Sequence, residues 1–299
     1  MLSDSSPVHP TDHDPLKGLI QFINTHLSEQ LDLEQLGKVA GYSHFHINRI
    51  FYACYGETLG QYIRKKRLEQ AARSLVHSQM RITEIAFQSG YQTPAAFSKA
   101  FKQTFQVTPK QIRLQGVLPH FQTSKINDDL SFRRKTMQID YEIRELPARK
   151  VIAVERRGLI HQNFNKAADL AFGVLVRYIN ANRLFGALEK HCLGITPDDS
   201  IEVTASESRY IAAYFIKPGK EITPRGEVKI LEIPAGRFAV FTHKGPYETL
   251  HLTWDWIYQD WLSDSKIVLR DAVPYEVYMN DKQLVPAQEL ITEIFIPII

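Results

Sequence analysis

A segment near the N-terminus carries side chains whose types and spacing could read DNA bases. Ile47, Ile50 and Phe51 recur at helical spacing, so they should form the buried face of one helix. The opposite face presents Asn48 and Arg49. In the major groove, an arginine can form two hydrogen bonds with guanine and an asparagine two with adenine. The candidate base-reading set of this helix is Ser43, Phe45, His46, Asn48 and Arg49.

A second segment, residues 82–113, has the layout of a helix, a glycine turn and another helix. Thr93 and Pro94 are of the types favoured at the N-cap and the first position of its second helix, and Ser43 is the expected cap of the earlier helix. Taken alone, the segment fits a DNA reader and a helical hairpin with a solvated basic face equally well. Its candidate DNA-contacting set is Thr93, Ala96, Lys99 and Lys102.

The two segments are copies of one unit. Leu36 matches Ile85 and Gly41 matches Gly90, both at an offset of 49 residues. A helical pattern over residues 59–75 joins the copies and would span roughly 25 Å at ~1.5 Å per residue. Two reading helices held about one DNA turn, ~34 Å, apart could enter successive major grooves. The duplication therefore favours DNA binding strongly over the hairpin.

The two copies differ in the residues that should face DNA. Ala95 and Ala96 can contact only thymine methyl groups, and Lys99 is a less exact base reader than Arg49. We therefore expect the first half-site to dominate specificity, which competition binding with base-substituted half-sites would measure. A basic run between the copies is expected to include phosphate contacts, with solvated surface charges as the alternative. That run is Arg64, Lys65, Lys66 and Arg67.

The C-terminal half is a duplication too, at an offset of 87 residues. Residues 145–148 match 232–235, and Gly158 matches Gly245. The two copies should pair about a pseudo-two-fold axis, with their helices beside a groove across one sheet, and a cleft between repeats is a natural ligand site. Helices are expected at residues 165–181 and 247–262, and strands near 193–195, 209–216, 275–278 and 290–296.

An acidic side chain lies among aromatic ones in this half. Strand alternation puts Glu276 and Tyr278 on one face. The helix over residues 247–262 is rich in aromatic residues, of which Trp256 lies off the common face and is harder to bury in the same core. An acid beside aromatic rings could bind a cationic amphiphile. The alternatives are an aromatic stripe that belongs to the core and a Glu276 that pairs with a neighbouring arginine. The residues on the common face are Trp254, Tyr258 and Trp261.

Charge and composition limit the classes of protein to consider. The 299 residues allow two domains with separate cores. Residues 1–115 hold 13 Lys and Arg against 9 Asp and Glu, whereas the rest hold 23 against 24, so only the first part should meet a polyanion. The two cysteines are far apart, which argues against a disulfide framework. His44 and His46 are wrongly spaced on a helix to share a metal ion, and we expect no metal site and no cofactor.

The N-terminal third also carries the residues of a family signature. They are Ile82, Ile85, Ala86, Gly90, Tyr91, Phe97, Phe101, Lys102, Thr108, Pro109 and Arg113, with Ala40, Gly41, Ser43, Phe51, Gly56, Tyr62 and Arg67 in the first copy. In these residues the chain resembles the DNA-binding domain of the AraC/XylS family of bacterial transcription regulators. The family places base contacts near Phe45, His46, Asn48 and Arg49. Gln106 departs from the pattern, because a glycine there would suit a left-handed helix end.

The second half carries another family pattern. It comprises residues 233–234, 237–241, 243–247, 261–262, 274–278, 280–281 and 294–298. In these residues the chain resembles the GyrI-like effector-binding domain. The resemblance implies that Glu276 contacts the ligand, with Tyr278, Tyr247 and Trp254 as further candidates. It also keeps open two other roles for this half: hydrolysis of a reactive small molecule, and binding of a protein such as DNA gyrase.

Together these patterns predict two domains. An all-α double helix-turn-helix domain is followed by an α+β duplicated GyrI-like domain with pseudo-two-fold symmetry. We expect a disordered tail at 1–14, the first domain at 15–114, a linker at 115–136 that docks in places through Leu118 and Phe121, and the second domain at 137–299. The expected function is transcription regulation, by activation rather than repression, with a cationic or hydrogen-bonding amphiphile as the effector and no enzymatic activity.

The expected partners are double-stranded DNA, the effector and RNA polymerase. No apolar run approaches the ~18 residues of a membrane helix, and the N-terminus lacks the apolar core of a secretory signal. The sequence therefore predicts a cytoplasmic, nucleoid-associated protein without a membrane partner. We expect a monomer or weak dimer.

Overall fold

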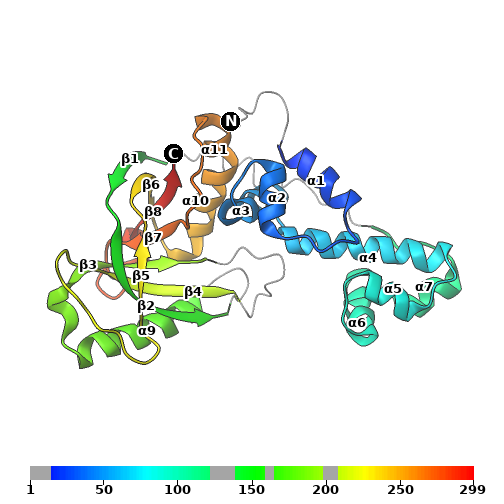
Figure 1. Ribbon diagram of the computed structural model, residues 1–299, viewed down its shortest axis with the longest axis horizontal. Coiled ribbons are helices and arrows are strands. Elements are labelled where there is room, and N and C mark those ends of the chain that lie inside the picture. Colours follow the sequence, from blue (N-terminus) through cyan, green and yellow to red (C-terminus); the bar gives the residue numbers. More distant parts are fainter. Residues whose placement is uncertain (1–14, 122–138, 159–164, 198–207) are drawn as a thin grey trace, which may run out of the picture.

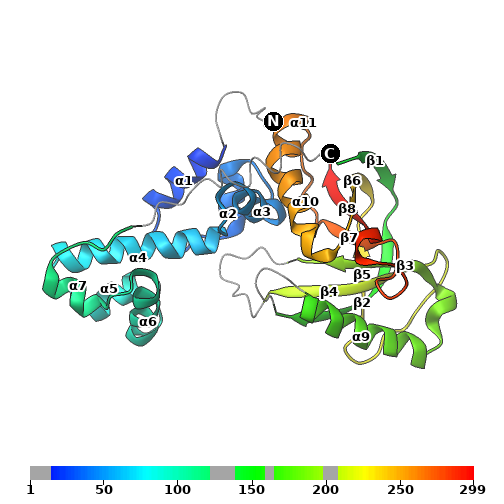
Figure 2. The ribbon, with the colours of Figure 1, turned by 180° about the vertical axis from the view of Figure 1, so that it is seen from behind.

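The computed structural model describes residues 15–121, 139–158, 165–197 and 208–299. The expected tail and most of the expected linker lie outside these residues. The N-terminal part is entirely helical and the C-terminal part is a sheet with helices, as predicted. Figures 1 and 2 show that helix α3 (His44–Tyr55) lies against the C-terminal part. The far end of the long helix α4 (Leu59–His77) carries α5 (Ile82–Gln88), α6 (Pro94–Phe105) and α7 (Pro109–Gln115) away from that part. Among the described residues, no helix is both long enough and apolar enough to cross a bilayer.

The helical part is the predicted pair of copies joined by one long helix. Leu59, Tyr62 and Ile63 of that helix complete the core of the first copy, and Leu68 and Leu75 complete the core of the second. The joining helix is therefore shared by two separate cores. The helices are α1 (Pro15–Thr25), α2 (Leu33–Ala40), α3 (His44–Tyr55), α4 (Leu59–His77), α5 (Ile82–Gln88), α6 (Pro94–Phe105) and α7 (Pro109–Gln115).

The predicted helix signals hold, with one exception. The Thr93 side chain accepts from the Ala96 N–H, and Thr108 forms a capping box with Gln111. Ser43 was expected to cap α3, but its side chain makes no capping hydrogen bond and its hydroxyl is buried without a partner. The backbone at Ser43 still has the extended conformation of an N-cap, so the start of α3 is set by the chain direction and by packing.

Gln106 ends α6 in the left-handed conformation, with φ of 61°. Its amide group donates to the Gln103 carbonyl at 3.0 Å. Because a side chain in this conformation costs roughly 1–2 kcal/mol that glycine avoids, we expect Gln106→Gly to raise the free energy of unfolding by about 0.5–1 kcal/mol. Gln106→Ala keeps the strain and loses the hydrogen bond, so it should lower the free energy. Chemical denaturation measures the free energy of unfolding of both variants. Equal free energies for Gln106→Gly and Gln106→Ala would contradict the conclusion that the left-handed conformation is strained here.

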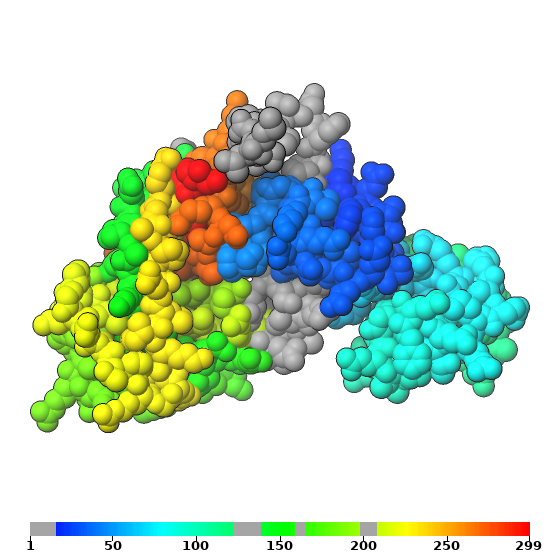
Figure 3. Space-filling view, viewed as in Figure 1, coloured from blue at the N-terminus to red at the C-terminus, as the bar shows by residue number. Residues whose placement is uncertain are grey.

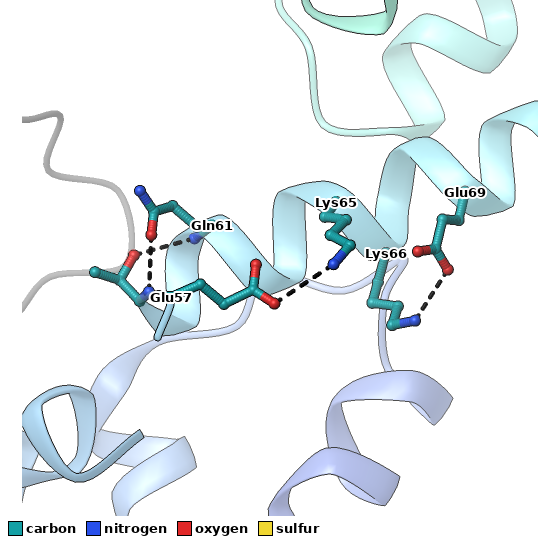
Figure 4. Close-up of polar contacts among 6 residues, drawn as sticks. Glu57, Gln61, Lys65, Lys66 and Glu69 are labelled. Atoms are coloured by element: carbon teal, nitrogen blue, oxygen red, sulfur yellow. Dashed lines mark hydrogen bonds and ion pairs between the residues drawn. The ribbon is translucent and has the colours of Figure 1, made fainter. Parts of the chain in front are cut away.

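The basic run on α4 is largely used inside the domain. Lys65 lies 3.6 Å from Glu57 and Lys66 lies 3.0 Å from Glu69, as Figure 4 shows. Arg67 donates to the Leu27 carbonyl at 2.8 Å and to the Glu29 carbonyl at 2.7 Å. Arg67 therefore anchors the loop before α2, a role that neither alternative for the run, a phosphate contact or a solvated surface charge, included. Of the run, Arg64 is exposed.

The C-terminal part is built on one antiparallel sheet in the order β1-β6-β8-β7-β3-β4-β2-β5. The order is symmetric about the β7–β3 pair, as the sequence duplication predicts. The first strand of each copy pairs with the other copy: β1 of the first copy pairs with β6 of the second, and β5 of the second copy pairs with β2 of the first. The strands are β1 (Tyr141–Leu146), β2 (Arg149–Arg157), β3 (Leu188–Ile195), β4 (Arg209–Ile216), β5 (Lys229–Ile233), β6 (Gly236–Lys244), β7 (Tyr275–Tyr278) and β8 (Ile291–Ile298).

Two helices cover one face of this sheet. Helix α9 (Asn165–Ala181) packs against the first copy, through a cluster that includes Val154 and Ala212. The second helix packs against Phe241 and Ile294 of the second copy. Strand pairing places these residues in one line across the sheet, and Glu276 lies in the middle of that line on the same face. Short 3₁₀ turns occur at Leu184–Ala187, Tyr247–Thr249 and Ala287–Glu289.

The second helix contains a π-helical turn. It runs as α10 (Leu250–Trp256), the π segment η3 (Ile257–Trp261) and α11 (Leu262–Ser265), and the Leu262 N–H bonds to the Ile257 carbonyl five residues earlier. The wider turn brings residues five apart onto one side. Trp256 and Trp261 consequently both contact Phe241, at ring distances of 6.2 and 4.7 Å. Trp256 is nevertheless only partly buried, whereas Tyr258 and Trp261 are buried, which agrees with the expectation that Trp256 is harder to bury in the same core.

The chain after α7 begins by returning to the second helix-turn-helix copy. Phe121 packs edge-on against Phe105, at a ring distance of 5.9 Å, and the Arg73 guanidinium lies 5.1 Å from the Phe121 ring. Leu118 remains exposed. Of the two residues expected to dock the linker, Phe121 does so and Leu118 does not.

Candidate functional site

Glu276 is the centre of a cluster of hydrogen-bonded side chains at the middle of the sheet. The indole N–H of Trp254 donates to Glu276 Oε1 at 2.6 Å, and the Tyr278 hydroxyl donates to Oε2 at 2.8 Å. The Tyr210 hydroxyl lies 2.8 Å from that of Tyr278, and the ring of Tyr247 lies 5.3 Å from the Tyr278 ring. We call these five residues the Glu276 cluster. The structure thus brings together all four residues predicted to bind an effector, and adds Tyr210.

Burial governs the charges in the Glu276 cluster. Desolvation raises the pKa of Glu276, although the hydrogen bonds from Trp254 and Tyr278 and the charge of Arg49 act to lower it. Desolvation also raises the pKa of Tyr210 and Tyr278, so both phenols stay protonated and able to donate at neutral pH. Glu276 is an acidic side chain that accepts two hydrogen bonds among aromatic rings, and such a set of groups can bind a cation with apolar substituents.

Gly194 makes room for the two phenols of the cluster. It lies on β3 directly opposite Glu276, and a Cβ at this position would meet the Tyr278 hydroxyl at 2.6 Å and come closer still to the Tyr210 hydroxyl. An isolated glycine inside a strand is the sequence signal that could have pointed here. Tyr210 had no such signal, because it reads as an ordinary aromatic residue of a strand.

We expect Gly194→Ala to destabilise the protein by about 1–3 kcal/mol, because the added methyl must push both hydroxyls aside. Thermal unfolding should show a lower Tm. The matched control is Gly186→Ala in the same domain, where nothing lies within 4 Å of the added Cβ, and its Tm should stay within about a degree. Equal effects of the two substitutions would contradict the close approach.

The side chains of the second copy that were predicted to contact DNA are exposed. Thr93, Ala96, Lys99 and Lys102 are all exposed on α6, and Phe97 and Phe101 hold the opposite face in the core. In the space-filling view this copy (cyan) stands apart from the C-terminal part, as Figure 3 shows.

The corresponding face of the first copy is covered, which corrects the expectation that it points outward. Helix α3 packs on α10 and η3. His46 is fully buried, with Nδ1 2.8 Å from the Tyr258 hydroxyl and Nε2 3.3 Å from the Arg270 carbonyl. Because a carbonyl can only accept, Nε2 carries the proton and Nδ1 accepts from Tyr258. Burial, with smaller contributions from Arg49 and His44, lowers the pKa of His46 to about 3, so the ring is neutral.

Arg49 reaches from α3 to the Glu276 cluster. Its Nη2 donates to the Thr196 carbonyl at 2.8 Å and to the Thr196 hydroxyl at 2.6 Å. Its guanidinium carbon lies 4.8 Å from the centre of the Trp254 ring, within the range of a cation–π interaction. The side chain with the best type for reading guanine is therefore held by the C-terminal part in this state.

The remaining candidates of the first copy also have intramolecular contacts. The Asn48 side-chain oxygen accepts from the Leu59 N–H at 2.8 Å at the start of α4, and the Phe45 ring lies 3.8 Å from that of His44. Asn48 thus supports the beginning of α4 in this docked state. His46 has no exposed surface in this docked state, and Phe45, Asn48 and Arg49 are each partly buried, so most of the predicted reading face is covered.

Both halves of the chain match known protein families. A GyrI-like small molecule binding domain matches residues 139–299, and a helix-turn-helix domain matches residues 36–115. The helical region is 37% identical over 103 residues to the probable transcription factor PqrA of Proteus vulgaris, which covers 34% of this chain and 84% of that protein. The chain belongs to the AraC/XylS family and carries a GyrI-like domain.

Further matches were found among curated proteins and among solved structures. The regulatory protein SoxS of Salmonella typhimurium is 35% identical over 98 residues, which is 33% of this chain and 92% of that protein. Among solved structures, the C-terminal domain of EcmrR matches 55% of this chain and 99% of its own length, at 18% identity and a TM-score of 0.42. The chain is a DNA-binding transcription regulator with a small-molecule-binding domain.

Proposed function

We propose that the chain is a one-component regulator that reads an asymmetric DNA site with two helix-turn-helix copies and binds a cationic amphiphile at the Glu276 cluster. The observation that carries the ligand class is the carboxylate of Glu276, held by Trp254 and Tyr278 among aromatic rings. The observation that carries the DNA role is the exposed, basic face of α6 beside a second copy of the same unit. RNA polymerase is the proposed partner on promoter DNA.

The effector role is tested by ligand binding to the full chain and to Glu276→Gln. The amide keeps the shape of the side chain and removes its charge, so benzyltrimethylammonium should bind the variant about tenfold more weakly. Binding of neopentylbenzene, its neutral carbon isostere, should change little. Isothermal titration calorimetry measures both affinities. Equal losses for both compounds would show that Glu276 is only a structural residue.

The DNA role is tested by the salt dependence of binding. We expect Lys99→Ala/Lys102→Ala to weaken binding to a duplex selected from a random pool with the wild-type chain. The slope of log K against log salt should become shallower by about one for each phosphate that the variant no longer neutralises. Lys229→Ala is the control, since it removes an exposed lysine from the GyrI-like domain. An unchanged slope in the double variant would exclude α6 from the DNA interface.

A further inference from the structure

We propose that Arg49 occupies the place of the effector's positive charge, so that a cationic effector and the docked DNA-reading helix compete for Trp254 and Glu276. This inference rests on the proposed effector site at the Glu276 cluster. It adds that, without an effector, the cation position of the site is filled by a residue of the DNA-binding domain itself. The effector would therefore act by displacing α3.

The first support is the position of the Arg49 guanidinium. It lies over the Trp254 ring, and the same indole donates its N–H to Glu276. A cation bound to an aromatic cage lies within ~6 Å of a ring centre, which is where Arg49 already lies. A ligand that stacks on Trp254 at this place must first displace Arg49.

The second support is the charge balance around Glu276. Both of its oxygens accept hydrogen bonds, as an ionised carboxylate requires, but burial opposes ionisation. The positive charge of Arg49 acts in favour of the ionised form. An incoming cation would take over this role, so that Arg49 could leave without stranding a buried negative charge.

The third support is that Arg49 belongs to the set of polar contacts by which α3 docks on the GyrI-like domain. Arg49 and His46 lie on the same face of α3 and together make the polar contacts with Thr196, Tyr258 and the Arg270 carbonyl. Displacement of Arg49 removes the charged part of this interface and weakens the docking of the whole helix. The freed face is the one that was predicted to read DNA, so effector binding and DNA binding by the first copy would favour the same undocked state. By linkage, DNA must then raise the affinity for the effector by the same factor.

The first experiment measures binding of benzyltrimethylammonium and neopentylbenzene to the wild-type chain, Arg49→Met and Arg49→Lys. Methionine keeps much of the side-chain volume and removes the charge. We expect Arg49→Met to bind benzyltrimethylammonium about tenfold more tightly than the wild-type chain, because the competing charge is gone, and Arg49→Lys to bind it with an affinity close to the wild-type value. Neopentylbenzene should also gain affinity in Arg49→Met, because it too must displace Arg49 to stack on Trp254. An unchanged affinity of Arg49→Met for the cation would overturn the competition. Failure of the cation to bind any of the three proteins would instead refute the proposed effector class.

The second experiment needs no substitution and follows the exposure of His46 in the wild-type chain. Diethylpyrocarbonate modifies neutral, accessible imidazoles, and peptide mass spectrometry separates the sites by fragment. His46 should be protected in the free protein, because it is fully buried, and should react several-fold faster when benzyltrimethylammonium is bound. The exposed His77 at the end of α4, which lies outside this interface, serves as an internal reference. If the cation binds and His46 stays protected, the effector site stands and the displacement of α3 is refuted.

Discussion

Replacement of Thr196 by valine and Tyr258 by phenylalanine is expected to tighten DNA binding about thirtyfold in the absence of an effector. The two substitutions remove the Thr196 hydroxyl that accepts from Arg49 and the Tyr258 hydroxyl that donates to His46. A hydrogen bond of this kind contributes about 1 kcal/mol, and about 2 kcal/mol corresponds to roughly thirtyfold in an equilibrium constant. Every candidate base-reading residue remains in place. The measurement is the Kd for a selected duplex at one fixed salt concentration.

The control for this pair is Tyr178→Phe/Thr223→Val. It makes the same two chemical changes in the GyrI-like domain, at a tyrosine of α9 whose hydroxyl lies 3.4 Å from the Thr223 carbonyl. The control should leave the Kd for DNA unchanged. If Thr196→Val/Tyr258→Phe binds DNA no better than the control, α3 is either undocked already or reads DNA through another face.

Acidification is expected to separate α3 from the GyrI-like domain. Burial lowers the pKa of His46 to about 3 in the docked state, against about 6.5 for an exposed histidine. Docking is therefore strongest above pH 6.5 and weakens as the pH falls from 6.5 towards 3, by up to about 1.4 kcal/mol per pH unit. At pH 5 the docking equilibrium should have shifted about thirtyfold. Small-angle scattering between pH 8 and pH 5 should show the chain becoming more extended.

Two neighbouring titratable groups must be separated from this effect. His44 also faces this interface, with its Nδ1 3.5 Å from Asp271 Oδ1. Glu276 has a raised pKa, so its protonation at low pH would weaken the hold on Arg49 and add to the effect. His46→Gln removes the main titration and should leave only a weak pH dependence. A wild-type profile that matches this variant would exclude His46 as the sensitive group.

Much of the fold could be predicted because each half of the sequence contains an internal duplication, so that the same local signals occur twice. The offset of 49 residues located both helix-turn-helix copies, and the turn glycines Gly41 and Gly90 have φ of 73° and 82°, as such turns require. The offset of 87 residues located the two halves of the sheet. The crossing of β1 and β5 could not be predicted, because each strand pairs equally well by pattern with its own copy or with the other one. The π turn at Ile257–Trp261 was also hidden, since one extra residue per turn leaves no compositional mark.

The site was predictable where one element determines it. Glu276 and Tyr278 share a strand face by alternation, and the structure places them together. The face of α3 was not predictable in this way, because helical spacing separates buried positions from outward ones without saying what the outward ones meet. His46 and Arg49 are outward with respect to their own domain, and they meet the other domain. Thr196 and Tyr258 were missed for the same reason, since their role exists only across the interface.

The exchange of β1 and β5 between the halves of the GyrI-like domain has a consequence for its ancestry and for its dissection. Each repeat lends its opening strand to the other, as two subunits do in a strand-swapped dimer. Fusion of the two subunits of such a dimer would give this topology without inventing a new one. A chain cut between β4 and β5 would accordingly yield two fragments. The first would lack β5 and leave β1 without its partner β6, and the second would lack β1 and leave β5 without its partner β2. Each fragment would need the other to complete its sheet.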